Sequence, residues 1–135
     1  MNLDKFYQSF HDQNGDYSDE ELKILEIKST PRYKFGMFIK IVINGKHFNK
    51  HLLKFFKGDD GEDVERGGLF LIYARAWYWI MDFDLNDEDW VDSITHYDFD
   101  EALLALKLCI KYFESVEDYE KCTHLFSIEK LLKNT

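Results

Sequence analysis

Alternation between apolar and polar side chains is clearest between residues 33 and 43. Every odd-numbered position in this range is apolar, and the β-branched residues among them favour a pleated strand. The Asn44-Gly45 pair that follows can adopt the left-handed conformations of a tight hairpin turn. We therefore predict that residues 46–56 return as an antiparallel strand, with the start of a helix as the alternative interpretation.

Three later segments complete the predicted sheet region. Residues 57–68 hold four of the seven glycines together with five acids, which predicts a loop. Residues 69–83 are apolar on every face, so periodicity alone does not separate a buried helix from a central strand. Their aromatic content and the preceding pair of glycines favour a strand. Residues 90–97 alternate again and predict one more strand.

Capping and spacing signals predict helices elsewhere in the chain. Asp98 or Asp100 can cap a helix over residues 98–113, whose acids lie in its first turn and whose lysines lie toward its end. Residues 116–133 place apolar side chains on one face of a last helix. Residues 2–15 show the spacing of a short amphipathic helix that ends in a glycine.

One segment is compatible with either type of element. Ser18 followed by Glu21 matches a capping box, which favours a helix start, but residues 18–29 also suit a strand. Pro31 ends whichever element forms. The order of elements predicts an α+β fold, an antiparallel sheet with helices packed on one face, in a single domain over residues 1–135.

Composition narrows the cellular setting. The longest strongly apolar run, residues 69–81, is interrupted by Arg75 and is shorter than the roughly 20 residues that a membrane-spanning helix needs. No basic flank precedes an apolar stretch at the N-terminus, so the sequence predicts a cytoplasmic protein. Cys109 and Cys122 form no CxxC pair and lie in predicted helices, which predicts reduced thiols.

Charge is distributed unevenly along the chain. Residues 1–57 hold 10 basic and 7 acidic residues, for a net +3, and residues 102–135 hold 5 of each. Residues 58–101 hold 2 basic and 14 acidic residues, for a net −12, so this third of the chain accounts for the overall charge of −9. The acids concentrate in the stretch MDFDLNDEDW, residues 81–90.

The acids do not match a metal-binding motif. Asp82, Asp84 and Asn86 occupy the first three ligand positions of a calcium loop. Asp87, however, stands where that loop has its glycine, and Ser93 stands where it has its bidentate glutamate. A second start, at residues 12–23, fails at the same two positions. The sequence therefore predicts no metal site and no cofactor.

The sequence contains no motif for other catalytic or binding chemistries. His47 and His51 have zinc-ligand spacing, but no glutamate follows His47 as in HExxH. No nucleophile turn or phosphate-binding loop is present, so we predict no catalytic residues. A small enzyme or metal-dependent regulator that uses the carboxylates of residues 82–89 is the alternative.

A nucleic-acid-binding module is a further alternative. The segment from Lys28 to Lys57 has eight basic residues and no acid, and its phenylalanines Phe38, Phe48, Phe55 and Phe56 could stack on bases. The net charge of −9 opposes the approach of a polyanion. The sequence therefore favours a protein partner over nucleic acid.

An acidic surface beside aromatic residues suits a strongly basic protein, because complementary potentials steer the encounter and an aromatic anchor concentrates binding energy. A single compact domain, rich in aromatics, without catalytic motifs and with clustered carboxylates, resembles the small acidic immunity proteins that bacteria carry beside contact-dependent growth inhibition toxins and other polymorphic toxins. That resemblance implies a toxin inhibitor that acts by protein-protein interaction on a basic toxin domain, commonly a nuclease. The predicted partner-binding residues are Asp82, Asp84, Asp87, Glu88, Asp89, Trp90 and Asp92.

Overall fold

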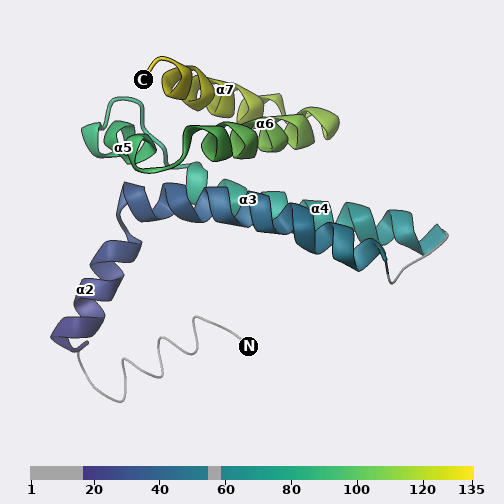
Figure 1. The fold of residues 1–135 in the computed structure, drawn as a ribbon, viewed down its shortest axis with the longest axis horizontal. Helices are drawn as coiled ribbons and strands as arrows, with labels where there is room; N and C mark the ends of the chain where they lie inside the picture. The colour runs from purple at the N-terminus through teal and green to yellow at the C-terminus, as the bar shows by residue number, and fades with distance from the viewer. Residues whose placement is uncertain (1–16, 55–58) are drawn as a thin grey trace. The chain divides into compact units, whose positions relative to one another are not determined.

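The computed structural model describes residues 17–54 and 59–135, apart from the side chains of residues 52, 53, 59 and 60. Within these ranges every regular element is helical, as Figure 1 shows. The elements are α2 (Asp19–Lys28), α3 (Pro31–Leu53), α4 (Asp59–Ile80), α5 (Glu88–Ser93), the short 3-10 helix η1 (Ile94–His96), α6 (Phe99–Ser115) and α7 (Tyr119–Lys133).

The chain divides into two compact units, one up to Thr30 and one from Pro31 to Thr135. In the first unit, α2 begins at the predicted capping box. The hydroxyl of Ser18 accepts a hydrogen bond from the backbone N–H of Glu21, and the Glu21 carboxylate accepts one from the Ser18 N–H. The ambiguous segment 18–29 is therefore a helix. The helix predicted over residues 2–15 lies outside the described residues.

The predicted α+β fold is wrong, because the described residues contain no strand and the fold is all-α. Residues 33–43, predicted as a strand, lie inside α3. This run is apolar at so many positions that it satisfies the helical spacing as well as the alternating one. Phe35, Phe38, Ile39 and Val42 recur at helical intervals, and all four are buried.

The predicted hairpin turn at Asn44-Gly45 is also wrong, since α3 continues through both residues. Gly45 allows a close approach of α4 instead. A Cβ atom built on it would lie 2.5 Å from Cγ2 of Ile72. Gly68 has the same role from the other side, because its Cβ would lie 2.4 Å from Oδ1 of Asn49.

The loop predicted over residues 57–68 is wrong from Asp59 onward, where α4 begins. The segment 69–83, for which a strand was favoured, continues α4 to Ile80. Acids at the start of a helix face its positive end, so the acidic and glycine-containing stretch is compatible with a helix N-terminus. The strand predicted over residues 90–97 is instead α5 followed by η1.

The start of α6 confirms one of the two predicted caps, whereas α7 begins at a cap that was not predicted. Asp98 caps α6 by accepting a hydrogen bond from the N–H of Glu101 at 3.0 Å. Asp118 caps α7 by accepting one from the N–H of Lys121. Both helices lie within two or three residues of their predicted bounds.

Helices of the second unit pack around one hydrophobic core. α3 packs along α4, α6 packs along α7, and α3 also contacts α5 and α6. The largest fully buried side chains include Phe35, Phe38, Leu106, Leu125 and Ile128.

Close packing also involves polar groups. The Tyr97 hydroxyl donates a hydrogen bond to the carbonyl oxygen of Arg32 at 2.5 Å, and its ring covers Gly36. Cys109 and Cys122 are buried free thiols, and burial raises the pKa of the Cys109 thiol above its usual range. None of the described helices has the combined length and apolar character that a bilayer span requires.

Candidate functional site

The acidic stretch connects α4 to α5, and two of its carboxylates fix the path of the backbone. After α4 ends, Asp84 accepts a hydrogen bond from the N–H of Asn86 at 2.9 Å. Asp87 then caps α5, accepting one from the N–H of Asp89 at 2.9 Å. Short acidic side chains favour such turns because they satisfy nearby backbone donors. We call residues 81–92 the acidic connection.

Two further carboxylates of the acidic connection lie near cationic or titratable partners. Asp82 is 3.8 Å from Nζ of Lys34 on α3, and its side chain is 60% exposed. Asp92 is 3.1 Å from Nε2 of His96. Solvent screens the exposed Lys34–Asp82 ion pair, so it stabilises the fold by at most about 1 kcal/mol, and the Asp92–His96 contact is an ion pair only when the imidazole is protonated. Neither contact therefore holds its carboxylate strongly.

Glu88 and Asp89 differ from the other acids of the connection. Both are exposed in the first turn of α5, where negative charge suits the helix N-terminus. Neither side chain makes a hydrogen bond or an ion pair with the residues that the structure describes. They are therefore the carboxylates of this connection most available to an external partner.

Trp90 does not have the exposed position that a binding anchor requires. Its side chain is only 5% exposed, and its ring centroid lies 4.9 Å from that of Phe83. Trp90 and Ser93 are the buried residues of α5, three positions apart on the face toward the core. The prediction that Trp90 contacts a partner therefore gains no support from its position, because its indole packs the acidic connection onto the core.

Leu85 is a residue that the sequence analysis did not select. It is 43% exposed in the middle of the acidic connection. Together with Glu88, Val91 and Asp92 it borders a shallow hollow of about 310 Å³, which Asn86, Thr95 and Thr135 complete. The sequence signal that could have identified Leu85 is a lone leucine within a strongly acidic run, since such a run is exposed to solvent. Two carboxylates of the acidic connection, Glu88 and Asp92, thus lie beside the apolar side chains of Leu85 and Val91.

The other predicted chemistries gain no geometric support from the structure. His47 and His51 are exposed one turn apart on α3. Across the described ranges, no three His, Cys, Asp or Glu side chains come together in an arrangement that could hold a metal ion. Of the phenylalanines considered for base stacking, Phe38 is fully buried and Phe48 is 60% exposed. Phe55 and Phe56 lie outside the described residues.

No protein-family model, curated protein or solved structure matches this chain.

Proposed function

We propose that this chain is an immunity-type protein of the cytoplasm that binds a basic toxin domain, such as a nuclease, through the acidic connection. Binding without catalysis is the proposed mode of action. The carboxylates would pair with Lys and Arg of the toxin and so obstruct its active site or the approach of its substrate.

One observation carries the proposal. Six exposed carboxylates lie within eleven residues around the exposed Leu85, and Glu88 and Asp89 have no partner among the described residues. An apolar centre with a charged rim is the usual anatomy of a specific protein interface. Opposite potentials accelerate the encounter with a basic protein and fix its orientation.

The test is retention of a basic partner by the purified chain. The gene product encoded next to this chain should be captured in a pull-down, and its toxic activity should fall in proportion to the complex formed. The double variant Glu88→Lys/Asp89→Lys should bind at least 100-fold more weakly. Loss of one desolvated charge pair costs about 2–5 kcal/mol, and the new lysines add repulsion.

A matched control separates contact from net charge. Glu62→Lys/Glu65→Lys makes the same change in charge at the opposite end of α4, where both residues are exposed. Its affinity should stay within about threefold of the parent at physiological salt, where charges are screened beyond about 8 Å. Equal affinity for the parent and the Glu88/Asp89 variant would refute the proposed surface. A metal-dependent turnover by the chain alone would favour the enzyme alternative.

A further inference from the structure

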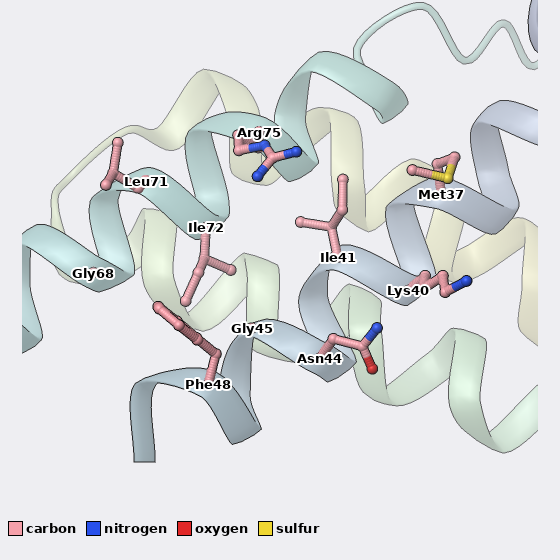
Figure 2. A pocket seen from close by; sticks show the side chains of 10 residues that line it. All are labelled: Met37, Lys40, Ile41, Asn44, Gly45, Phe48, Gly68, Leu71, Ile72 and Arg75. Atoms are coloured by element: carbon pink, nitrogen blue, oxygen red, sulfur yellow. The ribbon is translucent and has the colours of Figure 1, made fainter. Parts of the chain in front are cut away.

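A second surface of different character lies between α3 and α4. Figure 2 shows a groove whose two sides are formed by these helices. Its volume is about 590 Å³. Apolar side chains line most of it, while Lys40 and Arg75 extend from α3 and α4 respectively. The lining residues are Met37, Lys40, Ile41, Asn44, Gly45, Phe48, Gly68, Leu71, Ile72 and Arg75.

The glycines of the two helices set the register of the groove. Gly45 lies against Ile72 and Gly68 lies against Asn49, so the helices run antiparallel with these pairs at matching heights. Arg75, three residues beyond Ile72, is then level with residue 42 of α3. Lys40 lies two residues from that level, about 3 Å along the helix axis. The two cations therefore stand on opposite sides of the groove at nearly the same height.

Neither cation has a carboxylate partner within the described parts of the chain. Both Lys40 and Arg75 are exposed, and the ion pairs of the second unit involve other residues. In a chain of net charge −9, two unpaired cations beside an apolar surface are complementary to an acidic occupant.

Apolar surface extends along both helices and beyond the floor of the groove. On α3, Met37, Ile41 and Phe48 span twelve residues, or about 16 Å, which is about three helical turns. On α4, Leu71 and Tyr78 lie seven residues apart, and each is 62% exposed. An occupant that covers both sides must be about as wide as a helix, because a single acyl chain would leave the outer side chains in water.

We propose that the groove between α3 and α4 binds an amphipathic helix of a partner protein, whose apolar stripe is flanked by Asp or Glu side chains. The stripe would rest on Ile41 and Ile72, and the flanking carboxylates would reach Lys40 and Arg75. A second copy of this chain fits less well, because a two-fold contact through the groove would bring these cations together. The proposal does not depend on the partner of the acidic connection.

A designed peptide pair tests the proposal. The first is a fluorescein-labelled helix of about 18 residues with leucines at i, i+3, i+4 and i+7 and glutamates flanking them. The second has lysine at every glutamate position. Fluorescence anisotropy in 150 mM salt should show saturable one-to-one binding of the acidic peptide, at least tenfold tighter than the basic one. The net charge of −9 favours the basic peptide, so this preference would identify a local cationic site.

Two double variants locate the preference. Lys40→Glu/Arg75→Glu should reverse the order of the two peptides. Lys46→Glu/Lys50→Glu makes the same change in charge at two exposed lysines of α3 that do not line the groove. This control should still bind the acidic peptide more tightly than the basic one. Phe48→Ser changes a side chain that is 60% exposed. It should lower the affinity for the acidic peptide at least fivefold, while the urea midpoint stays close to that of the parent.

Several results would overturn the proposal. Equal binding of the two peptides would do so, and so would an unchanged preference in the Lys40/Arg75 variant. Stoichiometric binding of dodecanoate that is lost in that variant, without binding of the acidic peptide, would assign the groove to a small amphiphile. A concentration-dependent dimer abolished by Phe48→Ser would assign it to a second copy of the chain.

Discussion

Gly45 and Gly67 provide a direct test of the helical pair. Both lie inside helices, Gly45 in α3 and Gly67 in α4, but their surroundings differ. A Cβ at Gly45 would lie 2.5 Å from Cγ2 and 2.9 Å from Cγ1 of Ile72, whereas a Cβ at Gly67 would meet nothing within 4 Å. The same Gly→Ala change should therefore have opposite effects at the two positions.

The magnitudes follow from two opposing contributions. Alanine is favoured over glycine in a helix interior by about 1 kcal/mol. At Gly67 nothing opposes this gain, so Gly67→Ala should raise the free energy of unfolding by about 0.5–1 kcal/mol. At Gly45 the added methyl group overpacks the interface with Ile72, which typically costs about 1–3 kcal/mol. Gly45→Ala should thus be destabilising by up to about 2 kcal/mol after the helical gain is subtracted.

Urea denaturation followed by circular dichroism at 222 nm measures both changes, with thermal midpoints as a second readout. For a chain of this length, 1 kcal/mol corresponds to about 3–5 °C. The assay should also include Ile72→Ala, alone and together with Gly45→Ala. In the Ile72→Ala background the clash is absent, so Gly45→Ala should become stabilising by about 0.5–1 kcal/mol.

This change of sign is the decisive result. A Gly45→Ala cost that is the same with and without the Ile72 side chain would refute the close approach of α3 and α4. A destabilising effect of Gly67→Ala would contradict a helix at that position and would favour the loop interpretation of residues 57–68.

Two further predictions concern capping and alkaline pH. Asp98→Ala should lower the free energy of unfolding by about 0.5–2 kcal/mol, because it removes the acceptor for the Glu101 N–H. Urea denaturation should show a smaller loss for the control Asp100→Ala. Equal losses in the two variants would contradict Asp98 as the cap. Burial raises the pKa of Tyr73 from its ordinary value to about 12. The unfolded chain therefore ionises first, and stability that is complete at neutral pH should fall as pH rises from about 10 toward 12. Tyr73→Phe should reduce that fall in urea midpoint, and an identical pH profile would refute the assignment.

Features encoded by neighbouring residues could be predicted from the sequence. The starts of α2 and α6 depend on hydrogen bonds between residues three positions apart, as Ser18 and Glu21 show. Such signals keep their meaning whatever the rest of the chain does.

Features that depend on distant contacts were mispredicted. Residues 33–43 are apolar enough to form either a strand or a helix, and the choice rests on packing against α4 and α6. Gly45 has the composition of a turn, yet the structure uses it to accommodate Ile72, a contact 27 residues away in sequence. Propensity is a weak guide where tertiary packing opposes it.

The candidate site likewise has one feature that the sequence could predict and one that it could not. The exposure of its carboxylates followed from composition, because unpaired charges are rarely buried. The direction of Trp90 did not follow, because it depends on the phase of α5, a helix the sequence analysis had taken for a strand. A one-residue change in the phase of α5 would rotate this indole by about 100° around the helix axis, away from the core.

The structure also changes the meaning of the acidic segment 58–101. Five of its acids lie between Asp59 and Glu65 at the start of α4, and six lie in the acidic connection beyond its end. Residues 66–80 of α4, about 22 Å of helix, separate the two groups. The net charge of −12 is therefore distributed over separate surfaces.

That separation makes the two charge-reversal variants respond differently to salt. At 0.01 M ionic strength the screening length is about 30 Å, so both groups of acids attract a basic partner, and both Glu88→Lys/Asp89→Lys and Glu62→Lys/Glu65→Lys should slow association. At 0.15 M the screening length falls to about 8 Å, and only the variant in the acidic connection should still bind weakly. Its defect should then reside mainly in faster dissociation, because a lost contact, unlike a lost long-range field, is not restored by salt. Stopped-flow association and surface plasmon resonance across this range measure both rates. If the two variants keep identical salt dependence and identical dissociation rates, the partner senses net charge alone and the acidic connection is not its contact surface.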